Sequence, residues 1–263
     1  FDEAITLKKQ ILADAMRIMG PDSPGASAAR NSLAATYRDA GRLDEAITLY
    51  KQNLDDVTRV MGPHHPETLA SRHSLAGAYR DAGRLDEAIP LFERNLDDVA
   101  RTLGLDHPET LASRHSLAGV YRDAGRLDEA IPLFEQNLAD FMRILGPNRP
   151  DTFTSRSTLA GAYQAAGRLE EAIPLFEQNL ADFIRILGPD RPDTFTSRST
   201  LAGAYQTAGR LEEAIPLFEQ NLEDRTRTLG PVHPVTLTSR NNLANAYREA
   251  GRIEDADKLF QTP

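Results

Sequence analysis

The sequence contains no cysteine and no tryptophan, and it has no long apolar run. The lack of cysteine excludes disulfides, zinc–thiolate sites and thiol nucleophiles and is typical of a reducing compartment, so we expect a cytoplasmic protein. No apolar stretch approaches the roughly 20 residues of a membrane-spanning helix. Aromatic residues make up only 6% of the chain, so Leu, Ile and Ala must supply the core, and this composition favours helices.

Acidic residues outnumber basic ones, which gives the 263-residue chain a net charge of −9. With 40% hydrophobic and 26% charged residues, the composition is that of a folded globular protein. A negative long-range field repels nucleic-acid phosphates and anionic lipid. We therefore expect neither nucleic acid nor a membrane as a partner.

One tripeptide, AGR, recurs every 42 residues without a slip. Its glycines are Gly41, Gly83, Gly125, Gly167, Gly209 and Gly251. A fixed period of this length indicates repeats that pack on their neighbours. Because both ends fall inside helical patterns, we expect a fragment of a longer protein. No linker divides the chain, so we expect residues 1–263 to form a single array with a partial repeat 1–20, repeats 21–62, 63–104, 105–146, 147–188 and 189–230, and a partial repeat 231–263.

Each period contains the signals for two helices. The first is predicted to begin at Pro66, whose fixed φ suits the first turn, and to end at Ala82. Gly83 then supplies the left-handed residue that commonly follows a helix. The second is predicted to begin near Asp86, with an apolar residue at every third or fourth position, and to end near Gly104.

The stretch LAGAYRDAGRLDEAIPLF resembles the core of a tetratricopeptide repeat. The 42-residue period, the loop GLDHPET and the segment TSRNNLANAYREAGRIEDADKLF more specifically resemble the long repeats of kinesin light chains and their bacterial relatives, which implies a bacterial source. The sequence departs from the family where Arg replaces a common Leu three residues before the LA pair. The resemblance implies an all-α fold, a right-handed α-solenoid of antiparallel helix pairs (TPR superhelix), whose concave groove binds partner proteins.

The same resemblance implies that three positions in the first helix of each pair line this groove. They lie two residues before the Leu75 equivalent, two after it and five after it. The groove residues expected on this basis are Asn31, His73, His115, Ser157, Ser199 and Asn241 in the first row, Ala35, Gly77, Gly119, Gly161, Gly203 and Asn245 in the second, and Arg38, Arg80, Arg122, Gln164, Gln206 and Arg248 in the third.

The middle row is mostly glycine, which costs about 1 kcal/mol against alanine in a helix. Two explanations are equally open: a bare floor lets a peptide backbone approach, or close helix packing needs the space. The third row begins with arginines, so we expect a protein or peptide partner whose acidic residues dock on Arg80 and Arg122. Alternatively, these arginines pair with neighbouring aspartates.

Two further charged positions recur in every copy, an arginine in the first helix and an aspartate in the second. Because Arg72 and Asp98 are about equally far from the Gly83 turn, an antiparallel pair brings them abreast. We interpret the set as ion pairs that hold one hairpin to the next rather than as a ligand site. The set comprises Arg30, Arg72, Arg114, Arg156, Arg198 and Arg240 with Asp14, Asp56, Asp98, Asp140, Asp182 and Asp224, and the same interface is expected to hold Asn53, Asn95, Asn137, Asn179 and Asn221.

No catalytic or metal-binding constellation is recognisable. The chain has no phosphate-binding loop, no HExxH motif and no nucleophile with a repeated base beside it. His73 and His115 occupy equivalent positions in adjacent repeats, so packed helices would hold them roughly 10 Å apart, too far to share a metal. We expect no enzyme activity, no metal and no cofactor.

These observations favour a non-catalytic scaffold that binds a peptide or partner protein in its groove. Two alternatives stay open: the ligand-sensing arm of a larger signalling NTPase, and a purely structural or oligomerising spacer. In the first helix, Ala4, Ile5, Leu7 and Ile11 are expected to be partly exposed, which predicts end-to-end self-association of the fragment.

Overall fold

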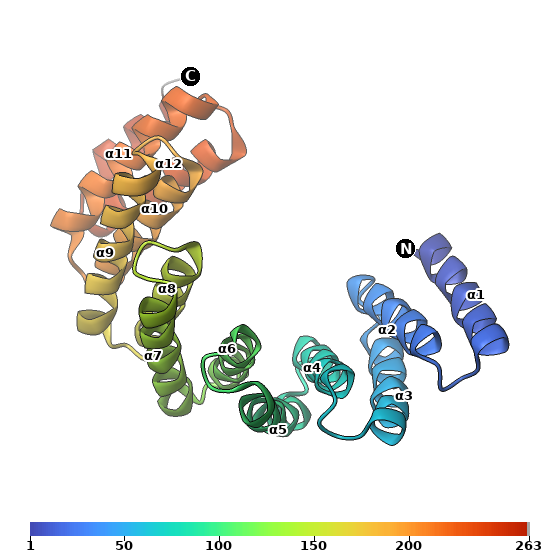
Figure 1. Ribbon diagram of the computed structural model, residues 1–263. Coiled ribbons are helices and arrows are strands. Elements are labelled where there is room, and N and C mark those ends of the chain that lie inside the picture. Colours follow the sequence, from blue (N-terminus) through green and yellow to red (C-terminus); the bar gives the residue numbers. More distant parts are fainter. Residues whose placement is uncertain (262–263) are drawn as a thin grey trace. The chain divides into compact units, whose positions relative to one another are not determined.

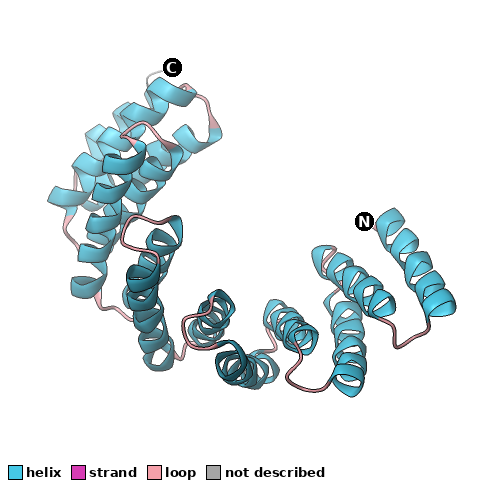
Figure 2. Cartoon of the chain, viewed as in Figure 1, coloured by secondary structure: helices cyan, strands magenta, loops and turns pink. Residues whose placement is uncertain are grey.

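The computed structural model describes residues 1–261, and these residues form 13 helices and no strand (Figures 1 and 2). The prediction of an all-α fold is therefore confirmed. The helices are α1 (Asp2–Met19), α2 (Pro24–Asp39), α3 (Leu43–Met61), α4 (Pro66–Asp81), α5 (Leu85–Leu103), α6 (Pro108–Asp123), α7 (Leu127–Ile144), α8 (Pro150–Ala165), α9 (Leu169–Leu187), α10 (Pro192–Thr207), α11 (Leu211–Leu229), α12 (Pro234–Glu249) and α13 (Ile253–Gln261).

The helices alternate between two kinds, as the 42-residue period predicts. The even-numbered helices, called A helices below, have 16 residues and start on a proline. The odd-numbered helices are called B helices. After α4, Gly83 adopts φ +69°, and the Arg84 N–H then donates to the Tyr79 carbonyl at 2.9 Å. This left-handed glycine ends the helix and turns the chain back, so α5 can pack antiparallel to α4.

The chain divides into two compact units, Phe1–Asp140 and Phe141–Pro263. In the first unit, consecutive helices from α1 to α6 contact one another, and in the second, those from α8 to α13 do so (Figure 1). Packing of each helix on the one before and the one after it defines a solenoid. The single continuous array predicted for residues 1–263 stays a prediction.

The core of each repeat consists of the residues that carry the tetratricopeptide resemblance. In α4, Leu75, Ala76 and Tyr79 are buried, and in α5, Ala88 and Phe92 face them from the other helix of the pair. The alanines have no exposed surface, and their small side chains let the helix backbones approach closely. Burial of one apolar stripe per helix explains why these positions recur at helical spacing.

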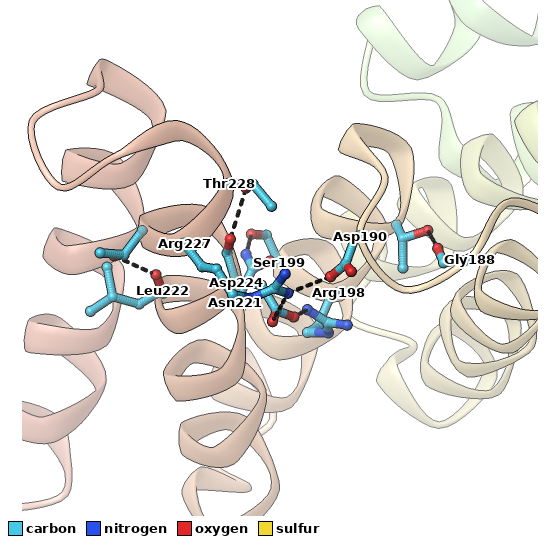
Figure 3. A network of polar contacts seen from close by, with 11 residues as sticks. Gly188, Asp190, Arg198, Ser199, Asn221, Leu222, Asp224, Arg227 and Thr228 are labelled. Atoms are coloured by element: carbon cyan, nitrogen blue, oxygen red, sulfur yellow. Dashed lines mark hydrogen bonds and ion pairs between the residues drawn. The ribbon is translucent and has the colours of Figure 1, made fainter.

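In five repeats, a buried arginine of the A helix forms an ion pair with an aspartate of the following B helix. Arg72 Nη1 donates to Asp98 Oδ2 at 2.7 Å, and each side chain is 4% exposed. In the second unit, Asp224 accepts from Arg198 at 2.7 Å and from Arg227 at 3.0 Å (Figure 3). The same pairing occurs between Arg30 and Asp56, Arg114 and Asp140, and Arg156 and Asp182.

The structure confirms that this arginine and aspartate lie abreast, but the predicted role is wrong in one respect. The pair lies within one repeat and does not hold one hairpin to the next, because the aspartate belongs to the B helix that follows the arginine's own A helix. Asparagines make the link between repeats in the first unit: Asn53 Nδ2 donates to Ser71 Oγ on the following A helix at 3.0 Å.

The first helix, α1, is only partly covered, because α2 is the one described helix that it contacts extensively. Leu7 and Ile11 are 60% and 49% exposed, and Ala4 is also exposed, as expected. Ile5 is buried, contrary to the expectation, since it lies on the face of α1 that packs on α2. None of the described helices combines the length and apolar character needed to cross a membrane.

The buried pair generates a stability prediction. Asp98→Ala leaves the Arg72 guanidinium buried without its carboxylate, so we expect the free energy of unfolding to fall by roughly 3–5 kcal/mol. Asp14→Ala is the matched control, because Asp14 pairs only with exposed Arg17 on the same helix and should cost less than about 1 kcal/mol. Urea unfolding followed by circular dichroism measures both, and equal losses would contradict a structural role for the buried pair.

Candidate functional site

The expected groove residues all lie on A helices. On α4, the spacing of His73, Gly77 and Arg80 by four and three residues places them on one helix face, and none of the three is buried. The same face carries Asn31 and Arg38 on α2, His115, Gly119 and Arg122 on α6, Ser157 and Gln164 on α8, Ser199 and Gln206 on α10, and Asn241, Asn245 and Arg248 on α12.

In the first unit, the arginines of this face are paired with aspartates of the protein itself. Arg38 forms an ion pair with Asp81, and Arg80 Nε donates to Asp123 Oδ2 at 2.5 Å. These ion pairs join consecutive A helices, so the structure contains the alternative pairing that the sequence left open. Among the described residues, Arg122 forms an ion pair with its neighbour Asp123 alone, at 3.2 Å, and shares that carboxylate with Arg80.

The glycines of the first unit provide space for these arginines. A Cβ at Gly119 would lie 3.2 Å from Arg80 Nη1 and 3.3 Å from Nη2. At Gly77 it would lie 3.6 Å from Arg38 Nη1. In this unit the packing explanation of the glycine row therefore applies, since each guanidinium extends across the bare backbone of the next A helix.

In the second unit, the equivalent glycine is open. No atom lies within 4 Å of a Cβ placed on Gly203. Gly203 is part of a hollow of about 510 Å³, called the polar hollow below, which is lined by Gln164, Ser199, Thr200, Gly203, Gln206, Thr207 and Glu249. Four of these residues were predicted as groove residues from the sequence.

Hydrogen bonds hold the groups of the polar hollow in place. Gln206 Nε2 donates to Glu249 Oε1 of the next A helix at 2.7 Å. Ser199 Oγ accepts from Asn221 Nδ2 of α11 at 2.5 Å (Figure 3). The sequence did not indicate this second bond, because the asparagine was expected only at the interface between hairpins and was given no partner. Because the Ser199 oxygen is the acceptor in this bond, the hydroxyl hydrogen is available to a ligand.

The histidines of the first unit pack against aromatic rings. His73 meets Phe92 edge-on at 5.4 Å between ring centroids, and His115 meets Phe134 at 5.5 Å. Burial lowers the pKa of both imidazoles, and nearby arginines lower it further: Arg38 beside His73, and Arg122 and Arg80 beside His115. Both histidines therefore favour the neutral form in the folded protein.

The loop histidines serve as helix caps. Nδ1 of His65, His107 and His233 accepts from the backbone N–H of Glu67, Glu109 and Val235 at 3.2, 3.2 and 3.3 Å. These bonds satisfy N–H groups of the first turn of α4, α6 and α12. Within residues 1–261, no three His, Asp or Glu side chains lie close enough together to hold a metal ion.

The sequence reasoning missed an apolar hollow of about 540 Å³ between α4 and α6, called the α4–α6 hollow below. It is lined by Pro66, Glu67, Leu69, Ala70, His73 and Ser74 of α4, Asn95 and Val99 of α5, and Glu109, Ala112 and Ser113 of α6. Of these, His73 alone was predicted as a groove residue. The signal that could have found it is Val99, a small side chain where later copies have Phe141 and Phe183.

The two histidines generate a pH prediction. Because their pKa values are lowered on folding, the unfolded chain binds protons more readily as the pH falls below about 6.5. Their contribution to stability is therefore fully present above this value and decreases below it. We expect the free energy of unfolding to fall between pH 7.5 and 5.5, and to fall less in a His73→Gln/His115→Gln variant. Urea titrations across this range test the difference; parallel profiles would contradict it.

The two kinds of glycine generate a stability prediction. Gly203→Ala should stabilise the protein by about 1 kcal/mol, because alanine favours a helix and the new methyl group has free space. Gly119→Ala should gain nothing or destabilise, because the Arg80 guanidinium and its ion pair must move. Thermal unfolding of the two variants provides the measurement, and an equal gain in both would show that the arginine adapts freely.

A family model for the tetratricopeptide repeat matches the chain in six overlapping stretches. They cover residues 1–55, 26–97, 73–141, 112–180, 151–223 and 193–262. Comparison with curated proteins gave no match. Tetratricopeptide arrays generally act as non-catalytic scaffolds for protein–protein interaction.

Solved structures show the same architecture. The nearly identical TPR-like repeats of a Podosopora anserina protein described as a kinesin light chain are 37% identical, with a TM-score of 0.71 over 76% of this chain and 94% of that one. BtubC (BKLC) from P. vanneervenii is 21% identical, with a TM-score of 0.67 over 83% and 88% of the two chains.

A third structure, a Signal Transduction ATPase with Numerous Domains (STAND) protein with a tetratricopeptide repeat sensor from Pyrococcus horikoshii, is 15% identical. Its TM-score is 0.68 over 99% of this chain and 41% of that protein, a likeness of fold alone. The family model spans almost the whole sequence, and the Podosopora repeats exceed a third in identity. The chain therefore belongs to the tetratricopeptide repeat family, and its repeats are similar to those of kinesin-light-chain-like proteins.

Proposed function

We propose that this chain is a non-catalytic scaffold that binds an extended segment of a partner protein along the exposed face of α8, α10 and α12. The observation that carries the proposal is the polar hollow around Gly203. It combines an open stretch of helix backbone with amide and hydroxyl groups on both sides.

The chemistry of the polar hollow suits a peptide backbone. An extended segment presents N–H and C=O groups in alternation, and it needs donors and acceptors at close range. Gln164 and Gln206 carry both in one side chain, and Ser199 adds a hydroxyl. The absence of a side chain at Gly203 permits the segment to approach the helix.

In the first unit, taken by itself, Arg122 would bind an acidic residue of a partner. Arg38 and Arg80 each hold an aspartate of the next A helix, so an acidic peptide would have to displace Asp81 or Asp123 to reach them. Arg122 has only the shared Asp123, and Ala165 occupies the sequence position of the next aspartate. Binding at Arg122 therefore costs less rearrangement than binding at Arg80.

A second candidate is the ligand-sensing arm of a larger signalling NTPase. The resemblance in fold to a STAND protein with a tetratricopeptide repeat sensor supports it. The structural match also covers 99% of this chain. Both candidates use the same face of the A helices. A sensor arm would require a nucleotide-binding domain elsewhere in the parent protein, which the parent gene would encode.

A library of random 12-residue peptides, displayed on phage and selected on the full chain, tests the proposal. We expect peptides that bind with micromolar dissociation constants and lose at least tenfold in affinity against Gly203→Leu, which fills the polar hollow. Acidic peptides that bind the first unit should lose affinity against Arg122→Ala more than against Arg80→Ala. Fluorescence anisotropy of labelled peptides gives the constants.

The matched control is Gln178→Leu, which adds the same apolar side chain to an exposed position of the B helix α9. Its affinity should equal that of the wild type. If no peptide is selected, or if Gly203→Leu and Gln178→Leu bind alike, the polar hollow is not the binding site. Selected peptides that bind every variant equally would indicate non-specific binding and favour the structural spacer.

A further inference from the structure

The α4–α6 hollow has a chemistry different from that of the polar hollow. We propose that it binds an aliphatic side chain of a partner segment while Glu67 and Glu109 pair with an adjacent lysine or arginine of that segment. The inference rests on the proposed function in that the partner is a protein segment, but it concerns another part of the A-helix face and another class of sequence.

The floor of this hollow is apolar and its walls are short. Leu69 and Val99 are 4% and 3% exposed at the base, and the exposed Ala70 and Ala112 stand on the two sides. A volume of about 540 Å³ falls within the roughly 300–1,000 Å³ of ligand sites. The hollow is therefore large enough for a leucine or methionine side chain and the backbone next to it.

Substitutions in the other unit fill the equivalent space. At the positions of Leu69 and Val99, the repeat of α8 and α9 has Phe153 and Phe183, whose ring centroids lie 5.0 Å apart. At the position of Ala70, which forms one wall of the hollow, that repeat has Thr154. Larger side chains thus occupy the space that Val99 and Ala70 leave open.

Charge selects the residue beside the apolar group. Glu67 and Glu109 are exposed, one in the first turn of α4 and one in the first turn of α6, and both line the hollow. Neither side chain takes part in an ion pair among the described residues. The helix dipole stabilises each carboxylate in place and leaves its oxygens free. No lysine or arginine lines the hollow, so a cation of the partner meets two carboxylates and no competing cation.

Asn95 adds a polar anchor in the floor. Its side chain is 3% exposed and lines the hollow, and Nδ2 donates to Ser113 Oγ at 3.3 Å. Within the described part of the chain, Oδ1 accepts no hydrogen bond. Asn95 therefore makes the floor partly polar, which suits a peptide segment more than a purely apolar molecule.

Three labelled decapeptides in a Gly/Ser background test the proposal on the full chain by fluorescence anisotropy. One carries Leu-Lys at its centre, one Leu-Glu and one Ser-Lys. We expect the Leu-Lys peptide to bind at least tenfold more tightly than the other two. Val99→Phe, which introduces the residue used by later copies, should reduce its affinity to that of the Ser-Lys peptide.

Glu67→Gln/Glu109→Gln alters only surface groups and tests the charge separately. It should remove most of the difference between the Leu-Lys and Leu-Glu peptides. The matched control is Asp151→Asn/Asp193→Asn, which removes the equivalent carboxylates from α8 and α10 and should leave the preference unchanged.

Equal binding of the three peptides by the wild type, no binding of any, or unchanged binding by Val99→Phe would each overturn the proposal. Preference for the Leu-Glu peptide would overturn it as well. If library peptides still depend on Gly203 in that case, the proposed function survives and only this second site is lost. If they do not, both fall.

Discussion

The ion pair between a buried arginine of the A helix and an aspartate of the B helix, present in five repeats, is the constraint from which the rest follows. Arg156 and Arg198 are 1% and 2% exposed, so each needs its carboxylate in a fixed place. This requirement fixes the register of the B helix against its A helix and thereby the direction in which the A-helix face points. The hollows on that face depend on a polar contact in the interior.

The exposed face has two chemical regimes built from one repeat. In the first unit, Arg38 and Arg80 lie across the glycines of the next helix and are neutralised by Asp81 and Asp123. In the second, glutamines replace arginines, and Gly203 is left open. A few substitutions at fixed positions thus change a surface of paired charges into one that carries neutral amide groups.

Sequence periodicity predicts the fold well, because the signals are local. Pro66 and Gly83 act through their own backbone preferences, and Leu75 and Phe92 recur at helical spacing. The face of the A helices was also predicted, through the family resemblance. Side-chain pairing was predicted only in part. The Arg72–Asp98 pair was expected, but Ser71 as the partner of Asn53 was not, since that contact depends on distances across helices. The α4–α6 hollow was not predicted for the same reason, because Val99 leaves a space only when its neighbours across the helices are also small.

Within each unit, the extensive contacts between helices run from one helix to the next along the chain, and this has a kinetic consequence. Proteins whose contacts are close in sequence have low contact order, and they fold without first closing long loops. A repeat of this array can therefore form as soon as its own two helices and the one before them are present. During synthesis, folding can follow the growing chain repeat by repeat, with little unfolded surface exposed at any moment.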